Sequence, residues 1–319
     1  MGKFKRKTVI VLKNNGALRK RRFVLSLPYI LLMLPAVIYM IIFNYLPMFG
    51  VVLAFKNYNY AQGILGSSWS GFKNFQFFFK SNDLIRILRN TILYNLASLI
   101  LVGLLFGMIL ALMLYEVKSR GANKVYQTTM LLPFFLSWVV VAGIALMFLN
   151  PKSGLLNSAL NAVGASPVNW YSEAKYWPFI LTFFMIWKDA GFASLYFYAA
   201  LLSIDTGLFE ACALDGAGRL RQIWYVSVPC LKPMACIVIV MRLGSIMSSQ
   251  LGLFYQVPMD SGALYETTDV IATYILRGLQ SNQISFTAAV GLFQSVVGLI
   301  LVLLSNFIIK RIDRDSAMF

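Results

Sequence analysis

The chain has 319 residues, of which 59% are hydrophobic and 13% are charged, and its formal net charge is +16. A soluble domain of this length would carry about twice that share of charged residues, so the composition indicates an integral membrane protein. Nine of the 28 Lys and Arg residues lie in the first 22 positions, with no acidic residue among them. A basic run before an apolar segment is typical of a cytoplasmic anchor facing anionic lipid, which argues against nucleic-acid binding.

Cysteine and histidine usage limits the chemistry of the chain. Cys212, Cys230 and Cys236 form no Cys-x-x-Cys pair, and there is no histidine to complete a zinc site. We therefore expect three small packing residues, no disulfide framework and no metal centre, and the Ser–His and metal–His catalytic arrangements are excluded. The uncharged run 23–55 is too long for a signal-peptide core, so it is interpreted as a retained transmembrane helix.

Six apolar spans follow in chain order, each long enough to cross a hydrocarbon core of about 30 Å. They cover residues 23–46, 91–115, 127–149, 176–202, 233–253 and 288–309. None alternates like a barrel strand, so we predict an all-α polytopic membrane bundle of six helices. The predicted parts are a basic cytoplasmic segment 1–22, a transmembrane domain 23–309 that includes a cytoplasmic loop 204–232, and a cytoplasmic tail 310–319.

The distribution of basic residues predicts the orientation of these spans. With six crossings, the N-terminus, the loop after the second span, the loop 204–232 and the tail share one side and hold eighteen Lys and Arg residues. The opposite side holds eight. The positive-inside rule then places both termini and the loop 204–232 in the cytoplasm.

Three charged residues interrupt the apolar spans. Lys188 and Asp189 lie in the middle of the fourth span, and Arg242 lies about ten residues into the fifth, roughly 15 Å deep. Charges at this depth must pair or face water, so we hypothesise that Asp189 pairs with Arg242 while Lys188 faces elsewhere. The sequence leaves open whether Asp189 and Arg242 form a structural pair or line a transient polar pathway.

Further polar and aromatic residues accompany these charges. Arg242, Ser245 and Ser249 are spaced to share one helical face, and Gln250 follows them. Small polar residues in membrane helices serve either close packing or a pathway. Trp187 and Tyr196 could stack on sugar rings or belong to the bundle core.

The loop 204–232 is polar and patterned. Asp205 or Thr206 can cap a helix through Glu210, and Gly216 breaks it. A second helix is predicted over about 219–226, with Pro229 and Pro233 ending it. Such a projecting helix–turn–helix suggests a docking element.

This stretch, EACALDGAGRLRQIWYVSVPCLKP, resembles the EAA motif of permease subunits of binding-protein-dependent ABC importers. The matching positions are Glu210-Ala211-Cys212, Asp215-Gly216-Ala217, Ile223, Val228-Pro229 and Pro233. Cys212 replaces a small residue and Val228 a leucine, both with little change in size or polarity. The segments FNYLPMFGVVLAFKNYN, LLPFFLSWVVVAGI and DVIATYILRGL look like the carbohydrate-uptake branch of the family.

The resemblance implies a type I ABC importer permease in a bacterial plasma membrane. It implies that the loop is a coupling helix seated in a cleft of a cytoplasmic ATPase, beside a second related permease, with an extracytoplasmic binding protein delivering the sugar. The implied coupling residues are Glu210, Ala211, Ala213, Asp215, Gly216, Ala217, Gly218, Ile223 and Pro229. The chain has no GxxxxGK[ST] phosphate loop, so ATP and Mg²⁺ are expected on the partner ATPase, with no cofactor on this chain.

Other functions remain open at this stage. A secondary transporter or channel would need no coupling loop and would usually show paired repeats with broken helices. A membrane enzyme would need a catalytic set, which is missing. An ABC permease for a solute other than a sugar would share the same motif, and the sequence does not identify the sugar.

Overall fold

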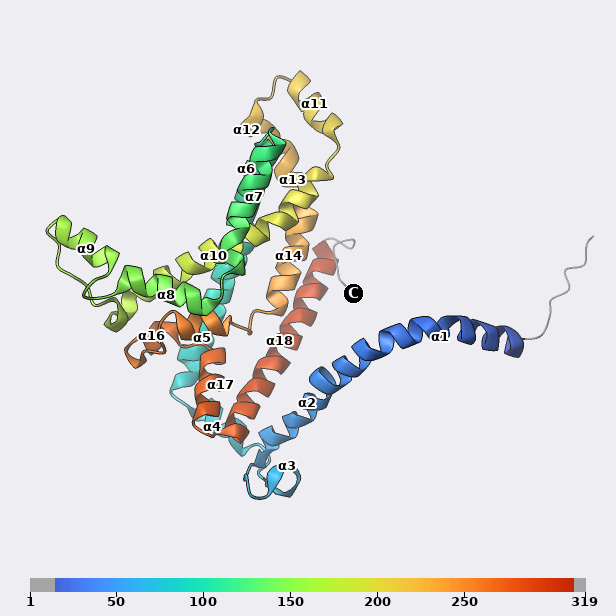
Figure 1. Cartoon of the computed structure of the whole chain (residues 1–319), viewed down its shortest axis with the longest axis vertical. Helices are drawn as coiled ribbons and strands as arrows, with labels where there is room; N and C mark the ends of the chain where they lie inside the picture. Colours follow the sequence, from blue (N-terminus) through green and yellow to red (C-terminus); the bar gives the residue numbers. More distant parts are fainter. Residues whose placement is uncertain (1–14, 313–319) are drawn as a thin grey trace, which may run out of the picture. The chain divides into compact units, whose positions relative to one another are not determined.

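The structure is a computed structural model that describes residues 15–312. The predicted N-terminal segment 1–22 and tail 310–319 therefore lie partly outside the described residues. The chain divides into two units, residues 1–52 and 53–319, and each is described by itself. Within the described residues the fold is almost entirely helical, with one antiparallel pair of two-residue strands (Figure 1).

The first unit contains one long apolar helix. Helix α1 (Asn15–Met40) runs without interruption into η1 (Ile41–Tyr45) and α2 (Leu46–Met48). The described side chains 26–49 are exposed, and the stretch Ser26–Phe55 has a mean hydropathy of 2.2. An apolar helix of this length with exposed side chains suits a lipid environment, as predicted for residues 23–46.

A turn-rich segment follows the helix of the first unit and leads into the second unit. Its elements are η2 (Phe49–Phe55), β1 (Lys56–Asn57), α3 (Gly63–Gly66), β2 (Ser68–Trp69) and α4 (Lys73–Lys80). In the strand pair, Lys56 lies opposite Trp69. The Lys56 ammonium is buried and donates to the carbonyl oxygens of Ile64 (2.8 Å) and Leu65 (2.9 Å), which fixes α3 against the strands.

Helices make up the rest of the second unit. They are α5 (Asp83–Ala97), η3 (Ser98–Phe106), α6 (Gly107–Glu116), α7 (Arg120–Phe135), α8 (Trp138–Leu149), α9 (Leu155–Ala162), η4 (Trp170–Ser172), η5 (Ala174–Tyr176), α10 (Trp177–Leu202), α11 (Thr206–Leu214), α12 (Arg219–Gln222), η6 (Ile223–Ser227), α13 (Val228–Cys230), α14 (Lys232–Gly244), α15 (Leu251–Gln256), η7 (Gly262–Leu264), α16 (Tyr265–Thr268), α17 (Ile271–Gln280) and α18 (Ile284–Ile312). By length and composition, four described helices could cross a membrane, or up to six if each of two bent pairs counts as one span.

Two of the predicted spans are not single helices. The span 127–149 bends by 93° between α7 and α8, because Leu136 leaves the helical conformation and Ser137 accepts a bond from the Val140 backbone to start a new helix. The span 233–253 stops at Gly244 and resumes only at Leu251. Apolar composition predicted the length of each span but did not predict the break within it.

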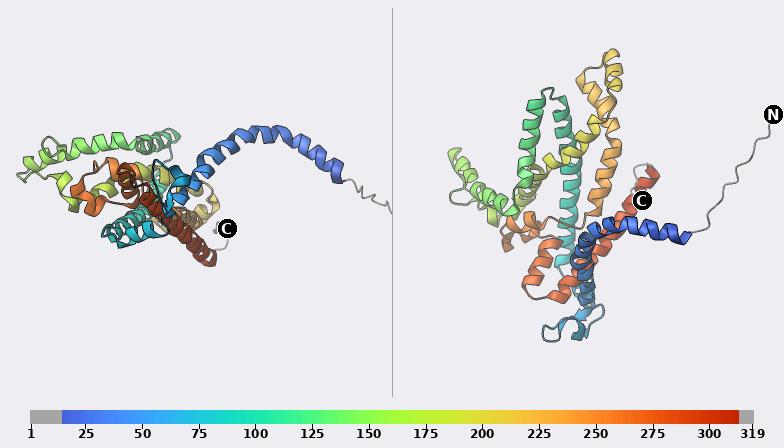
Figure 2. Two further views of the ribbon diagram at one scale, coloured as in Figure 1. Left: turned by 90° about the horizontal axis from the view of Figure 1, so that it is seen from below. Right: turned by 45° about the vertical axis from the view of Figure 1, so that its right-hand side comes forward.

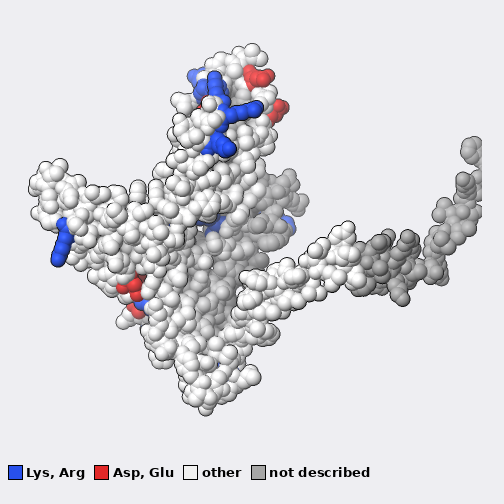
Figure 3. All heavy atoms as spheres, viewed as in Figure 1, with Lys and Arg blue, Asp and Glu red and all other residues white. Residues whose placement is uncertain are grey.

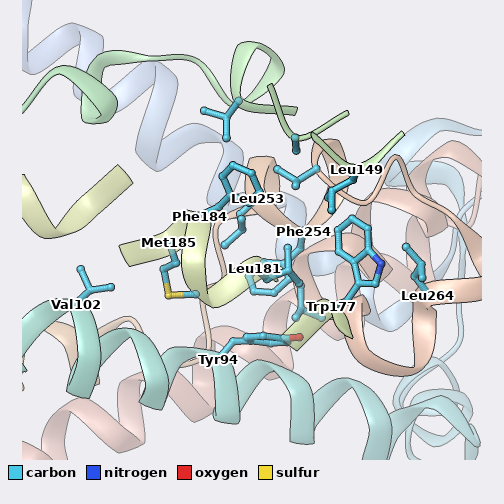
Figure 4. Close-up of a cluster of buried hydrophobic side chains, with 14 of the residues drawn as sticks. Tyr94, Val102, Leu149, Trp177, Leu181, Phe184, Met185, Leu253, Phe254 and Leu264 are labelled. Atoms are coloured by element: carbon cyan, nitrogen blue, oxygen red, sulfur yellow. The ribbon is translucent and has the colours of Figure 1, made fainter. Parts of the chain in front are cut away.

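Helix α10 lies at the centre of the second unit, packed on α6, η3 and α7. Its residues Trp177, Leu181 and Phe184 join Tyr94 and Leu253 in the main hydrophobic core (Figure 4). The views in Figures 1 and 2 place α11 and α12 at one end of this unit, and α4 and α17 at the other.

Candidate functional site

A short stretch of non-helical backbone forms the centre of the candidate site. Helix α14 ends at Gly244, and residues 245–250 leave the helix before α15 begins. Local hydrogen bonds satisfy part of this non-helical backbone. The Ser248 amide donates to the Ser245 carbonyl oxygen (2.8 Å), and the Ser245 hydroxyl donates to the Arg242 carbonyl oxygen (3.1 Å). In a membrane, irregular backbone is tolerated where protein buries it or where it lines a cavity.

Two cavities meet this non-helical stretch, with volumes of about 360 and 300 Å³. Arg242, Ser245 and Gln250 line both of them. The larger is also lined by Tyr94, Asn95, Ser98, Met185, Ser248, Ser249, Leu253 and Phe254, and the smaller by Phe134, Asp189, Phe192, Tyr196, Val238 and Met241. Polar side chains of the bundle interior thus gather around residues 245–250, where they can donate and accept hydrogen bonds.

The predicted pair of Asp189 with Arg242 does not form in the described structure. The Asp189 carboxylate instead accepts a hydrogen bond from Gln250 Nε2 at 2.8 Å. The Arg242 guanidinium donates to the Ser98 hydroxyl at 3.1 Å. Because α14 ends at Gly244, Ser249 does not continue its helical face, so the predicted alignment of Arg242, Ser245 and Ser249 on one helix is wrong beyond that point.

Lys188 occupies a different environment from Asp189, as its helical position predicted. Its ammonium is buried and donates to three carbonyl oxygens at the end of α7, those of Pro133 (3.1 Å), Phe134 (2.7 Å) and Leu136 (2.6 Å). The last carbonyls of a helix lack partners within it and carry its negative dipole. Lys188 therefore caps the break between α7 and α8 and does not line the two cavities.

The predicted pathway residues form two groups, those that line the two cavities and those that do not. Asp189, Tyr196, Arg242, Ser245, Ser249 and Gln250 all line the cavities. Trp187 instead faces an apolar hollow of about 580 Å³ beside Phe183 and Ile144. In the described residues, no three His, Cys, Asp or Glu side chains gather as a metal-binding group.

Sequence reasoning missed Asn95 and Ser98, which line the larger cavity from the second predicted span. Asn95 Nδ2 donates to Ser249 Oγ at 3.2 Å, and Ser98 accepts from Arg242. Two polar residues near the start of an otherwise apolar span were the available signal. Neither residue lies beside a charged residue of its own span, and their approach to Arg242 and Ser249 depends on packing between distant helices.

The patterned loop folds as two helices joined by a glycine turn. Asp205 caps α11 by accepting a hydrogen bond from the Gly207 amide (3.0 Å), and Gly216 follows with φ +78°. The second helix is longer than predicted and runs through Pro229 to Cys230. Proline lacks an amide hydrogen, and the wider π-helical turns of η6 precede it and accommodate the missing bond.

The candidate coupling residues lie on an exposed surface. Glu210, Ala211, Ala213, Asp215, Gly216, Gly218 and Pro229 are exposed, and Ala217 and Ile223 are half-buried. Leu214 beside them is 89% exposed, and no hydrogen bond or ion pair of the described residues involves the carboxylates of Glu210 and Asp215. In Figure 3, basic and acidic side chains gather over this end of the second unit, and the visible bundle surface below carries few charges.

Residues 103–317 match the family described as "Binding-protein-dependent transport system inner membrane component". The chain belongs to this family. The predicted resemblance to binding-protein-dependent permeases is therefore confirmed, and the two-helix loop described above is the part of this inner membrane component that carries the EAA pattern.

Two similar curated proteins come from Bacillus subtilis (strain 168). Protein LplB is 36% identical over 292 residues, covering 90% of this chain and 89% of its own length. The polygalacturonan/rhamnogalacturonan transport system permease protein YteP is 33% identical over 290 residues, covering 90% and 88%. The sequence similarity to these two relatives therefore covers 90% of the chain.

The chain is also similar to solved structures of alginate transporters. One is a bacterial ABC transporter involved in the import of the acidic polysaccharide alginate, with a TM-score of 0.83, 35% identity, and coverage of 93% of this chain and 99% of the other. Another is a bacterial alginate ABC transporter in complex with an alginate pentasaccharide-bound periplasmic protein, with a TM-score of 0.81 and 35% identity over 92% and 97%. The inner membrane component thus has the type I ABC permease fold.

Proposed function

We propose that the chain is the transmembrane subunit of an ATP-driven importer that passes a saccharide across a bacterial plasma membrane by alternating access. The observation that carries this proposal is the exposed loop α11–α12. It offers unpaired carboxylates and an uncovered leucine at one end of the bundle, on a chain with no phosphate-binding loop of its own. Such a surface suits a cytoplasmic ATPase.

The remaining subunits follow from the family. Two ATPase subunits bind ATP and Mg²⁺, a related permease completes a heterodimer, and an extracytoplasmic binding protein delivers the saccharide. Both termini lie in the cytoplasm together with α11 and α12, consistent with the excess of basic residues there. The catalytic groups for ATP hydrolysis lie on the ATPase, so this chain is not itself an enzyme.

The two cavities around residues 245–250 provide the pathway. Amide, hydroxyl and guanidinium groups there can exchange hydrogen bonds with sugar hydroxyls as the bundle changes conformation. The names of the similar permease YteP and of the alginate transporters support a saccharide, and an acidic one in particular, as the solute.

Binding of the ATPase tests this proposal. Co-expressed with the ATPase and permease genes of its own locus, the chain should purify as a complex whose ATP turnover rises when binding protein and saccharide are added. A chain that purifies alone and shows no stimulated turnover would favour the secondary-transporter alternative. Stimulation of ATP turnover by a non-sugar solute alone would favour an ABC importer permease for a solute other than a sugar.

A further inference from the structure

A further polar hollow of the second unit lies away from the cavities of the pathway. It has a volume of about 930 Å³ and is lined by residues of α4 and of the start of α18. Helix α4 lies at the end of the unit opposite α11 and α12 (Figure 1). Its lining residues are Asn57, Tyr58, Lys73, Asn74, Gln76, Phe77, Lys80, Ser81, Tyr274, Asn282, Gln283, Ile284, Ser285 and Phe286. The volume lies within the range of pockets that hold small organic ligands.

The hollow is positively charged. Lys73 and Lys80 are its only ionisable lining side chains apart from the two tyrosines, and no acidic residue lines it. Both lysines are exposed, and neither ammonium group has a hydrogen bond or an ion pair within the described residues. The nearby Asp83 is already paired with Arg86 at 2.8 Å. An anion entering the hollow would therefore meet two uncompensated positive charges.

One face of α4 presents these groups. Lys73, Gln76, Phe77 and Lys80 follow the i, i+3, i+4, i+7 spacing that places side chains on one side of a helix. Phe78, on the opposite side, is fully buried against α18. Since the buried face holds α4 in place, the polar face is presented to the hollow as a fixed surface.

Hydrogen bonds also fix the other walls. The Tyr58 amide donates to Ser285 Oγ at 2.8 Å, and the Tyr60 hydroxyl donates to Asn282 Oδ1 at 3.1 Å, so the segment after β1 is tied to the start of α18. Asn74 Nδ2 donates to the carbonyl oxygens of Ala54 (2.8 Å) and Lys56 (3.0 Å), which ties α4 to the same segment. The hollow is therefore preorganised rather than a gap between loose loops.

The remaining lining favours a polyhydroxylated ligand. The side-chain amides of Asn57, Gln76 and Gln283 make no hydrogen bond within the described residues, and each both donates and accepts. Aromatic rings of Tyr58, Phe77, Tyr274 and Phe286 add apolar faces. A phosphate headgroup would use the lysines but leave the free amides unused. A sugar chain bearing carboxylates would use all three kinds of group.

We propose that this hollow, defined by Lys73 and Lys80, is an entry site that binds an acidic oligosaccharide before it reaches the bundle interior. The proposal rests on the proposed function and adds a place on this chain where its saccharide first binds. The two lysines lie seven residues apart on α4, about 10.5 Å along the helix axis, so two carboxylates spaced along one chain can each meet an ammonium. The site therefore favours a chain with at least two uronate units over a monosaccharide.

Direct binding tests the proposal on the full chain in nanodiscs of zwitterionic lipid. Tetragalacturonate is titrated against galacturonate and against the neutral galactotetraose, at low and high salt. We expect tetragalacturonate to bind at least tenfold more tightly than either comparison, with affinity falling as salt screens the lysines. Equal affinity for the neutral tetrasaccharide, or no binding at all, would overturn the proposal.

Variants locate the binding within the molecule. Lys73→Gln/Lys80→Gln should weaken tetragalacturonate binding roughly tenfold or more, whereas Lys73→Arg/Lys80→Arg should largely retain it. Lys152→Gln removes an exposed, unpaired charge elsewhere in the second unit and should change nothing. Equal binding by K73Q/K80Q and wild type would contradict the site. Loss of wild-type tetragalacturonate binding when anionic phosphatidylglycerol is added at constant salt would assign the site to lipid instead.

Uptake by the assembled transporter separates this proposal from the general one. Wild-type uptake of an acidic oligosaccharide supports the proposed function, and its reduction in K73Q/K80Q supports the entry site. Uptake that is equal in both would overturn the entry site while leaving the importer function intact.

Discussion

Gln250 donates a hydrogen bond from Nε2 to Oδ2 of Asp189 over 2.8 Å, and this bond joins the non-helical stretch after α14 to the middle of α10. Arg242 is held separately by Ser98 of η3. The two opposite charges therefore remain at the cavities instead of neutralising each other through a direct contact. Both side chains line the smaller cavity.

The bond between Gln250 and Asp189 can be tested by a double-mutant cycle. Gln250→Leu leaves a buried carboxylate without its donor and should lower the free energy of unfolding by about 2 kcal/mol, measured by thermal unfolding in nanodiscs. Asp189→Asn/Gln250→Leu should cost less than the sum of the single changes. Ser248→Ala, on the same stretch, is the control. Recovery of stability by the charge swap Asp189→Arg/Arg242→Asp would instead indicate the direct pair.

Lys188 should be a structural residue. Lys188→Met removes three charge-assisted bonds to the end of α7 and should destabilise the chain by about 3 kcal/mol or more. Lys152→Met, which removes an exposed and unpaired lysine, should change the unfolding temperature little. An unfolding temperature of K188M equal to that of wild type would show that the α7–α8 break needs no cap.

Gly216 should be required for coupling because of its backbone conformation. It has φ +78°, and a Cβ there would meet nothing within 4 Å, so a substitution strains the backbone without a clash. Gly216→Val should uncouple ATP turnover from uptake, while Gly216→Asn, which tolerates this conformation better, should retain more coupling. Gly164→Val carries the same strain at φ +78° after α9 and serves as the matched control. Equal coupling in G216V and G164V would argue against the docking role.

Asp269 should fix the end of the bundle opposite α11. Its buried carboxylate accepts from Arg277 Nη2 (2.6 Å) and Arg86 Nη2 (3.1 Å). Asp269→Asn breaks a buried ion-pair network and should lower the free energy of unfolding by about 3 kcal/mol. Asp83→Asn removes a half-buried partner of the same Arg86, which is far more solvated than Asp269, and should cost below about 1 kcal/mol. Equal losses in thermal unfolding would contradict this ranking.

The sequence predicted the features that depend on composition and on turn-forming residues nearby in the chain. Apolar run length predicted four long apolar helices, and the glycine after Asp215 predicted the turn between α11 and α12. Of the three charged residues inside the predicted spans, Asp189 and Arg242 line a cavity, whereas Lys188 contacts the end of α7. These features follow from lengths and from residues a few positions apart, which a single sequence contains directly.

The sequence could not predict features that depend on contacts between distant segments. The partners of Asp189 and Arg242 depend on α14 ending at Gly244, which brings Gln250 rather than Arg242 to Asp189. The Lys188 ammonium that contacts the break at Leu136 lies fifty-two residues later in the chain. The hollow beside α4 needs residues 282–286 as its second wall.

Uptake by proteoliposomes tests the central claim most directly. The chain is reconstituted with its partner permease, ATPase subunits and binding protein, and entry of a labelled oligosaccharide is followed with and without ATP. We predict uptake that requires ATP and that Glu210→Lys/Asp215→Lys abolishes while the chain remains folded in the membrane. Uptake by this chain alone without ATP, or normal uptake by the Glu210→Lys/Asp215→Lys variant, would contradict the account.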